Sequence, residues 1–494
     1  MTLAELLAGV GLRQSIPAEL APRTVNGLDY DSRRVGEGFV FFAFSGSRTD
    51  GRRFASDALG RGAVAVVSED GAPEGLAGKW IEVHHGRQAL ALAAGNFYGH
   101  PDERIRLTGI TGTNGKTTTA LLTDAVLRAS GATTALIGTI GYHLAGRLLP
   151  AVNTTPESLD TLRLLSELER AGGTHAVMEV SSHALALGRV YGFRFHTAVF
   201  TNLTRDHLDF HGTMEEYFAA KQKLFTGSGG PPPACAVINQ DDPRARTLPL
   251  SKEMQVWRYG LGPESSLRAR HISSSIGGLR FDVQMGKKRI AVESPLIGKI
   301  NVYNILAACG AGLSYGLDGE TIARGIASLR VVPGRFERID EGQPFTVVVD
   351  YAHTDDAMRN VIAVARGLGP KRIITLFGCG GDRDRAKRPL MGQAAAEGSD
   401  LVVLTSDNPR SEDPLAIMND ALVGIRRTDV AHVVEPDRAA AIARALKEAR
   451  EGDMVILAGK GHETYQVLKD KTIAFDDRVV AREVLKGYGY QPRR

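Results

Sequence analysis

Short apolar runs alternate with polar, turn-forming segments along the whole chain, a pattern typical of buried strands separated by helices. The apolar runs predict strands at 39–44, 63–67, 107–110, 176–180, 197–200, 345–350, 372–377, 401–405 and 453–458, with further short strands across 252–297. Periodicity and composition predict helices at 88–98, 117–129 and 301–315. Because strands and helices alternate most regularly after residue 333, we expect a parallel, doubly wound sheet there.

Two turn-rich points divide the chain into three predicted units. His100-Pro101-Asp102 is a turn signal, and Pro333-Gly334 precedes the last set of strands. We therefore expect α/β domains at 1–102, 103–332 and 333–494, the last one Rossmann-like. Ligands of such sheets bind at the carboxyl ends of the strands, where the loops 350–353, 378–384 and 407–410 carry charged side chains.

Composition excludes several classes of protein. The 494 residues carry 60 Lys+Arg against 56 Asp+Glu, a formal net charge of +4 that gives no general case for a nucleic-acid partner. Three widely spaced cysteines predict neither a disulfide framework nor a zinc site. We expect no export signal, because Glu5 interrupts the apolar start, and no span of the roughly 20 apolar residues that cross a bilayer. A cytoplasmic protein without stable membrane association is the simplest reading.

A glycine-rich loop lies between the strand predicted at 107–110 and the following helix. It comprises Gly112, Thr113, Asn114, Gly115, Lys116, Thr117 and Thr118. Glycines let backbone N–H groups wrap a phosphate, and the helix N-terminus adds positive potential. We expect Lys116 to reach the β- and γ-phosphates, and Thr117 or Thr118 to hold Mg²⁺. The strict P-loop pattern fails at Ile110, so the loop alone indicates only a nucleoside triphosphate site, or a glycine-rich turn with an exposed lysine.

Two further groups lie at predicted strand ends. Glu179 ends one apolar strand and His207 follows another, where both can hold a cation beside the phosphate loop. Either residue alone is more often structural, and only the company of the phosphate loop favours a metal site.

A lysine occupies the apolar face of a helix that a capping box at Thr213 and Glu216 predicts. Lys221 follows Tyr217 by four residues and precedes Phe225 by four, so it shares their side of the helix. Burial would lower its pKa and make the amine a nucleophile. The alternative, which the helix pattern alone favours, is a lysine whose stem is buried and whose amine reaches water.

These motifs together resemble the Mur ligases, the ATP-dependent amino-acid ligases of peptidoglycan synthesis. The resemblance rests on T-G-T-N-G-K-T, D-H-L-D-F-H-G…Y-F-A-A-K, D-Y-A-H and D-N-P-R, in family order from Asp31 to Glu463. It implies a UDP-binding first domain, a central P-loop ATPase-type domain, and a last domain that binds the incoming amino acid. It also implies that Lys221 is carbamylated by CO₂ (N6-carboxylysine) and helps to hold a second Mg²⁺, beside Glu179 and His207.

The resemblance further assigns three sets of ligand-binding residues. On the nucleotide side it implies Asn301, Arg335, Asp350 and His353. For a UDP-MurNAc-dipeptide it implies Tyr30, Ser32, Ser47, Arg48, Thr49, Asn153, Thr154, Thr155, Ser181 and Arg189. For meso-diaminopimelate it implies Arg383, Asp407, Asn408, Pro409, Arg410, Gly459 and Glu463. Leu187 and Asp355 depart from the family pattern, which has Gln and Pro there.

The activity implied is ATP-dependent addition of meso-diaminopimelate to UDP-MurNAc-L-Ala-D-Glu through an acyl phosphate, by a monomer. Three alternatives remain from the residues: a lysine-adding homologue, a folylpolyglutamate synthetase, and a nucleotide-binding switch without ligase activity. The first domain argues against folate, and Asp407–Arg410 argues against lysine.

Overall fold

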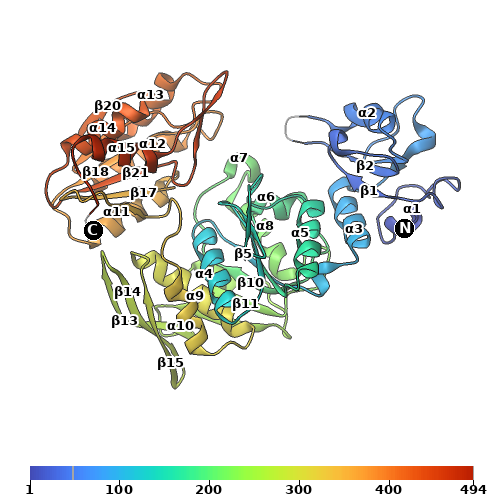
Figure 1. Cartoon of the computed structure of the whole chain (residues 1–494), viewed down its shortest axis with the longest axis horizontal. Coiled ribbons are helices and arrows are strands. Elements are labelled where there is room, and N and C mark those ends of the chain that lie inside the picture. Colours follow the sequence, from blue (N-terminus) through green and yellow to red (C-terminus); the bar gives the residue numbers. More distant parts are fainter. Residues whose placement is uncertain (47–48, 493–494) are drawn as a thin grey trace.

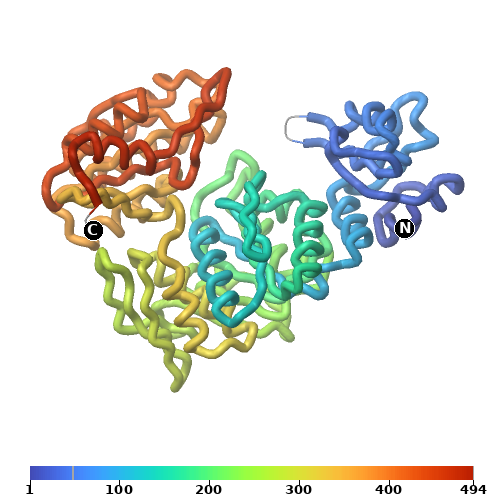
Figure 2. Tube along the Cα trace, in the orientation of Figure 1, coloured from blue at the N-terminus to red at the C-terminus, as the bar shows by residue number. Residues whose placement is uncertain are grey.

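The computed structural model describes residues 1–46 and 49–492. Three large sheets follow one another along the chain, with the first and last on opposite sides of the middle one (Figure 1; the tube in Figure 2 shows the same path). The predicted α/β class is confirmed in each of them.

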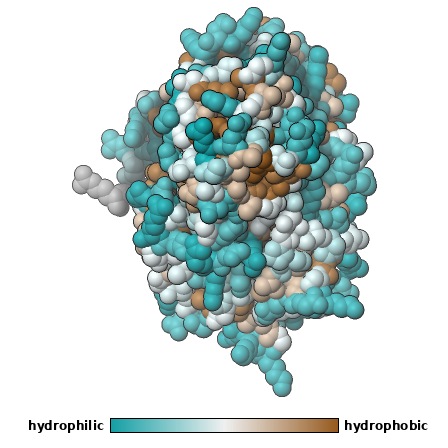
Figure 3. Space-filling model, turned by 90° about the vertical axis from the view of Figure 1, so that its right-hand side faces the viewer, coloured by the Kyte–Doolittle hydropathy of each residue, from teal (hydrophilic) through white to brown (hydrophobic). Residues whose placement is uncertain are grey.

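The N-terminal unit is a four-stranded parallel sheet in the order β1-β2-β3-β4. Its strands are β1 (Gly27–Asp29), β2 (Phe39–Ala43), β3 (Ala65–Ser68) and β4 (Trp80–Glu82), and its helices are α1 (Leu3–Leu6), α2 (Ala55–Gly60) and α3 (Gly86–Tyr98). Figure 3 views the molecule from this side, where hydrophilic residues surround a small group of hydrophobic ones.

The middle unit contains an eleven-stranded sheet in the order β15-β14-β13-β12-β11-β10-β5-β9-β6-β7-β8. Its strands are β5 (Arg106–Thr111), β6 (Thr134–Ile137), β7 (Tyr142–Leu144), β8 (Arg147–Leu149), β9 (His175–Glu179), β10 (Phe195–Phe200), β11 (Cys235–Asn239), β12 (Gln255–Gly260), β13 (Leu267–Ser275), β14 (Gly278–Met285) and β15 (Lys288–Ser294). Its helices are α4 (Lys116–Ala129), α5 (Ser158–Arg170), α6 (Ser182–Leu187), α7 (Leu208–His211), α8 (Met214–Thr226), α9 (Lys299–Ser314) and α10 (Gly319–Ser328).

Alternate residues of the central strands belong to different cores. Ile110, Val177 and Val199 pack with α4, α9 and α10, whereas Met178 and Phe200 pack with α5, α6 and α8. Because both faces are covered, the strands are continuously apolar, which is why their composition predicted them. Seven neighbouring strands of this sheet, β13, β12, β11, β10, β5, β9 and β6, are parallel and direct their carboxyl ends to one edge.

The C-terminal unit is a six-stranded sheet in the order β16-β17-β21-β18-β19-β20, parallel except for β16. Its strands are β16 (Glu337–Ile339), β17 (Thr346–Asp350), β18 (Ile373–Phe377), β19 (Leu401–Leu404), β20 (Ala431–Val434) and β21 (Met454–Ala458), beside the hairpin β22 (Tyr465–Val467) and β23 (Thr472–Ala474). Its helices are α11 (Asp355–Gly367), α12 (Lys387–Gly398), α13 (Pro414–Ile425), α14 (Arg438–Glu448) and α15 (Asp477–Gly487). The predicted doubly wound sheet is confirmed.

Helices of the described ranges, 1–46 and 49–492, include none long and apolar enough to cross a membrane.

Candidate active site

The phosphate loop joins β5 to α4 and faces the C-terminal unit. Gly112 and Gly115 have positive φ angles of 148° and 86°. A side chain at Gly112 would collide with Thr201, and one at Gly115 with Asn304, so both positions require glycine. No side chain of the described residues caps the start of α4. Its first N–H groups are therefore left without a capping side chain, as an anion site requires.

Glu179, at the end of β9, faces the first turn of α4. Its Oε2 accepts a hydrogen bond from Thr117 Oγ1 at 2.9 Å, and its Oε1 accepts one from the backbone N–H of Thr139 at 2.8 Å. A hydroxyl and a carboxylate side by side are oxygen ligands of the kind that Mg²⁺ takes, usually together with substrate phosphates. The predicted pairing of Glu179 with the phosphate loop is thus present geometrically.

Both predicted lysines turn toward the backbone of this loop. Lys116 Nζ donates to the carbonyl oxygens of Gly112 and Thr113, at 2.9 and 2.8 Å. Lys221, on α8, is 1% exposed, and its Nζ lies 4.4 Å from the centre of the Tyr217 ring. Burial, and next the charge of Lys116, hold the pKa of Lys221 well below its ordinary value. Of the two alternatives that the apolar helix face left open, the structure has the fully buried lysine.

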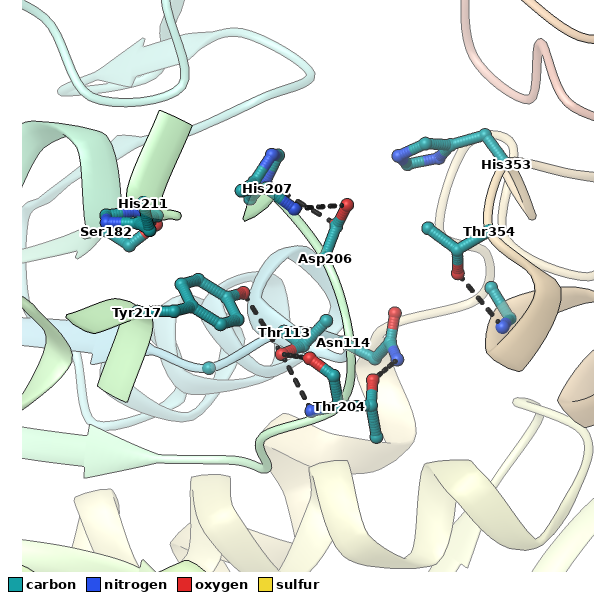
Figure 4. Close-up of polar contacts among 12 residues, drawn as sticks. Thr113, Asn114, Ser182, Thr204, Asp206, His207, His211, Tyr217, His353 and Thr354 are labelled. Atoms are coloured by element: carbon teal, nitrogen blue, oxygen red, sulfur yellow. Dashed lines mark hydrogen bonds and ion pairs between the residues drawn. The ribbon is translucent and has the colours of Figure 1, made fainter. Parts of the chain in front are cut away.

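His207 follows β10 in a left-handed conformation, with a φ of 54°. Its ring lies 4.8 Å from that of His183, and burial lowers its pKa to about 3. A neutral imidazole is the form that binds a metal. Figure 4 shows His207 and Asp206 on the middle unit, with His353 of the C-terminal unit pointing toward them.

The predicted nucleotide residues line a cavity of about 100 Å³ between the two units. Asn301, Arg335 and Asp350 lie there with residues of the phosphate loop, and Ile300, Val361 and Val364 supply apolar walls. His353 does not line this cavity but two others next to His207. One lies among the predicted amino-acid residues, and the other, the phosphate-loop cavity, is formed by Gly112–Thr117 with Glu179 and Lys221. The departure at Asp355 leaves α11 intact, because Thr354 caps it by accepting from the N–H of Ala357.

The predicted amino-acid residues surround a larger cavity of about 320 Å³. Arg383, Asp407, Asn408, Arg410, Gly459 and Glu463 line it, from the carboxyl ends of β18, β19 and β21. Pro409 lies just outside this lining. His183, Asp206 and His207 close the side that faces the middle unit. Sites predicted from separate loops therefore converge, as the parallel sheet required.

The polar groups of this cavity are already ordered by the protein. Arg410 has a φ of 52° and donates from Nη1 to the carbonyl oxygen of Gly381 at 2.7 Å. Asn408 donates from Nδ2 to Glu463 Oε2 at 2.9 Å. Burial raises the pKa of the Asp407 carboxyl, against the charges of Arg438 and Lys460. Arg383 is exposed at the rim.

Arg438 binds the backbone at the carboxyl ends of two of these three strands, β19 and β21, from the buried side. It is fully buried in an ion pair with Asp477, and it donates to the carbonyl oxygens of Ser406 and Ala458 at 3.2 and 3.0 Å. These carbonyl groups immediately precede Asp407 and Gly459, so Arg438 fixes the spacing of the loops that carry them.

The residues predicted for a UDP-linked substrate fall into two places. Tyr30 donates to Asp160 of the middle unit at 2.5 Å, whereas Ser32 is buried in the N-terminal unit and Thr49 is exposed. Ser47 and Arg48 lie outside the described residues.

The second group adjoins Glu179. Thr155 Oγ1 donates to the carbonyl oxygen of Glu179 at 2.8 Å and accepts from the N–H of Ser181 at 3.0 Å. Thr154 Oγ1 lies 3.1 Å from that of Thr139, and Arg189 donates to Thr155 O at 3.0 Å. Asn153 accepts at its carbonyl from Tyr142. Of these residues, Thr154 and Ser181 line the phosphate-loop cavity.

Sequence reasoning missed the residues that join the middle and C-terminal units. Asp356 Oδ2 on α11 accepts from Asn114 Nδ2 at 2.9 Å and from Thr204 Oγ1 at 3.1 Å. Lys387 Nζ donates to Asp206 Oδ1 at 2.9 Å. Burial alone would raise the pKa of Asp206, but the ion pair with Lys387 helps to hold it below its ordinary value. Asp206 directly precedes His207 in the D-H-L-D motif, so the sequence could have indicated Asp206 as a further site residue.

The geometry defines an α/β nucleotide-binding enzyme whose second cavity is lined by both guanidinium and carboxylate groups. Family models match most of the chain: "Mur ligase family, catalytic domain" at residues 24–98, "Mur ligase middle domain" at 110–312, and "Mur ligase, glutamate ligase domain" at 334–461. This chain belongs to the Mur ligase family.

Individual relatives are similar over nearly their full length. The chain is 74% identical, over 99% of both sequences, to the UDP-N-acetylmuramoyl-L-alanyl-D-glutamate–2,6-diaminopimelate ligase of Solibacter usitatus. It is 47% identical to the ligase of that name from Geobacillus thermodenitrificans, over 93% of this chain and 94% of the relative. A solved structure of a ligase with that name is 34% identical, with a TM-score of 0.69, over 99% of this chain and 100% of the other.

Proposed function

We propose that this chain uses ATP to join meso-2,6-diaminopimelate to the D-Glu side-chain carboxylate of UDP-MurNAc-L-Ala-D-Glu, giving UDP-MurNAc-tripeptide, ADP and phosphate. The relatives named above support this substrate pair. The observation that carries it is that the phosphate-loop cavity and the amino-acid cavity share Asp206, His207, Tyr351 and His353 in their walls. A carboxylate activated in one cavity is therefore next to an amine held in the other.

The proposal divides the work among three units. Residues 1–102 would bind the UDP end of the acceptor, through Tyr30, Ser32, Ser47, Arg48 and Thr49. Residues 103–332 would bind ATP and the peptide end of the acceptor, and residues 333–494 the incoming amino acid. We expect a monomer in the bacterial cytoplasm.

Phosphoryl transfer depends mainly on positioning and on charge neutralisation. Lys116 would approach the β- and γ-phosphates from the loop, and Gly112–Thr118 would wrap them. Asn301, Arg335 and Asp350 would contact the rest of the nucleotide, and His353 would face its phosphate end. The acceptor's carboxylate would enter along Asn153, Thr154, Thr155, Ser181 and Arg189, toward Lys116.

The residues around Glu179 fit Mg²⁺, because Thr117 and Glu179 offer oxygen atoms and His207 a neutral nitrogen. Bound there, Mg²⁺ would neutralise charge on the transferring phosphoryl group. Lys221 fits carbamylation, because its buried amine has a strongly lowered pKa and CO₂ reacts with the neutral form. The added carboxylate would give a second cation an oxygen ligand from α8.

On the other side, the amine of diaminopimelate would attack the acyl phosphate and release phosphate. Asp407 and Glu463 would bind ammonium groups, Asn408 would line the site while holding Glu463 through its Nδ2, and Arg410 and Arg383 would bind carboxylates. Pro409 and Gly459 would shape the backbone of the cavity.

The test is a turnover assay with purified protein, ATP and Mg²⁺. One set of reactions offers UDP-MurNAc-L-Ala-D-Glu with meso-diaminopimelate or lysine as the amine, and another offers a folate substrate with glutamate. Mass spectrometry should detect the diaminopimelate tripeptide, with one ADP released per product. Preferential lysine addition, glutamate addition to a folate substrate, or nucleotide binding without any ligation would each refute the proposal in favour of one of the three alternatives.

A further inference from the structure

An ammonium group lies buried directly behind the amino-acid cavity. Lys460 follows β21 and is fully buried. Its Nζ donates to Glu463 Oε2 at 2.9 Å and lies 3.3 Å from Asn408 Oδ1. Glu463 and Asn408 both line the cavity, whereas Lys460 lies outside the lining in the described part of the chain. Lys460 therefore touches the wall of the cavity from the protein side.

A buried cation is costly unless neighbouring groups compensate it. Removing an ammonium from water costs several kcal/mol in real proteins, and an apolar side chain of similar volume is often as good for stability. Lys460 is compensated by residues of two different loops, Glu463 after β21 and Asn408 after β19. Its charge also opposes the raised pKa of Asp407. This lysine thus organises the polar side of the cavity more than it adds to the core.

The hydrogen bonds fix the orientation of both lining residues. Asn408 Oδ1 accepts from the N–H of Val467 at 2.9 Å as well as facing Lys460, so its Nδ2 must point to Glu463. Lys460 and Asn408 both donate to Oε2 of Glu463. Among the described residues no donor binds Oε1, which leaves that oxygen for a cationic ligand.

We propose that Lys460 is a positioning residue of the amino-acid cavity: it holds Glu463 and Asn408 so that Glu463 Oε1 receives an ammonium group of the incoming amino acid. The proposal rests on the function proposed above and adds a residue that never touches the substrate. Loss of Lys460 would free the Glu463 side chain and leave its Oε2 short of a donor, which weakens amino-acid binding without touching the nucleotide cavity.

The experiment compares Lys460→Met and Lys460→Gln with the wild type, measuring KM separately for meso-diaminopimelate, ATP and UDP-MurNAc-L-Ala-D-Glu. Lys460→Met should raise KM for diaminopimelate by about tenfold or more, the worth of a hydrogen bond to a charged group. The other two KM values should stay within about twofold. Lys460→Gln keeps a donor and should raise the diaminopimelate KM less. Lys471→Met, an exposed lysine in the neighbouring hairpin turn, is the matched control.

A double-mutant cycle separates positioning from general damage. In a Glu463→Gln background, Lys460→Met should add much less than it does alone, because the two residues act together. If Lys460→Met does not fold, as judged by circular dichroism and ADP binding, Lys460→Met/Glu463→Gln is compared with Glu463→Gln, since removing both charges leaves none unpaired.

Three results would overturn the inference: an unchanged diaminopimelate KM in folded Lys460→Met, an equal rise in all three KM values, or full additivity with Glu463→Gln. Failure of the wild type to ligate diaminopimelate would instead reject the proposed function, so the two failures are distinct.

Discussion

Lys116 Nζ and Lys221 Nζ donate hydrogen bonds to one and the same oxygen, the carbonyl of Gly112, at 2.9 and 2.8 Å. Two ammonium groups at one acceptor repel each other, and burial adds to the cost of charging both. The neutral amine is therefore favoured at Lys221. Addition of CO₂ would convert this repulsion into attraction, because a carbamate is an anion beside Lys116.

Lys221→Ala should lower kcat by about 10²-fold or more, since a ligand for a cation is lost at the centre of charge transfer. Short carboxylic acids such as acetate should restore part of the activity by filling the space. The exposed lysine two positions along α8 supplies the control, Lys223→Ala, which should keep its rate. Intact-mass measurement and dependence of the wild-type rate on CO₂ give a second readout. A rate independent of CO₂ and no rescue would argue against the carbamate.

Lys116→Ala should lower kcat by about 10³-fold while the protein stays folded, because charge stabilisation in the transition state is lost. Acyl-phosphate formation can be followed separately, by transfer of labelled phosphate from ATP to the acceptor without amino acid. Near wild-type turnover in a folded variant would remove the loop lysine from the mechanism.

Arg410 should decide between diaminopimelate and lysine. Lysine lacks the far carboxylate and would leave a desolvated arginine unpaired, so the wild type should prefer diaminopimelate by about 10⁴-fold in kcat/KM. Arg410→Ala should lose about 100-fold with diaminopimelate, mainly through KM. The activity of this variant with lysine should rise little, because removing the unpaired arginine adds no favourable contact for lysine. Competition between the two amino acids in one assay measures the ratio, and similar kcat/KM values in the wild type would contradict this assignment.

His175, at the start of β9, should make stability depend on pH far from the active site. Its ring lies 4.9 Å from that of Tyr315, and burial lowers its pKa from 6.5 to about 4. The folded state keeps this ring neutral, whereas the unfolded chain protonates it below 6.5. Stability is therefore full above pH 6.5 and falls as the pH drops toward 4.

The measurement is the melting temperature of the wild type and of His175→Gln at about pH 7.5 and about pH 5. Between these two pH values the melting temperature should fall less in His175→Gln than in the wild type. The difference corresponds to about 1 kcal/mol in the free energy of unfolding, a small value because solvent screens the partly exposed ring. His432→Gln, an exposed histidine on β20, should behave as the wild type does. Equal acid sensitivity in all three proteins would refute the role of His175.

The strands that composition predicted are those buried on both faces, such as β5, β10 and β21, because continuous apolar runs mark them. Short strands such as β7 and β16 were missed, since three residues carry no period. The burial of the Lys221 amine stayed open in the sequence, but its place on an apolar helix face was predictable from helical spacing alone. Asp356 and Lys387 were not, because their partners lie on another unit and only the folded chain brings Asn114 and Asp206 to them. The unit boundaries at 102 and 332, and the roles of individual site residues, stay predictions.

The nucleotide cavity takes one wall from the phosphate loop and the other from α11, where Asn114 binds Asp356. A nucleotide bound there would contact both units and so hold them together, because the units otherwise meet through few polar contacts. A compound that fills the apolar part of the cavity and keeps Asn114 from reaching Asp356 would hold the two units apart. Such a compound would inhibit by holding the amine away from the activated carboxylate, without resembling either of them.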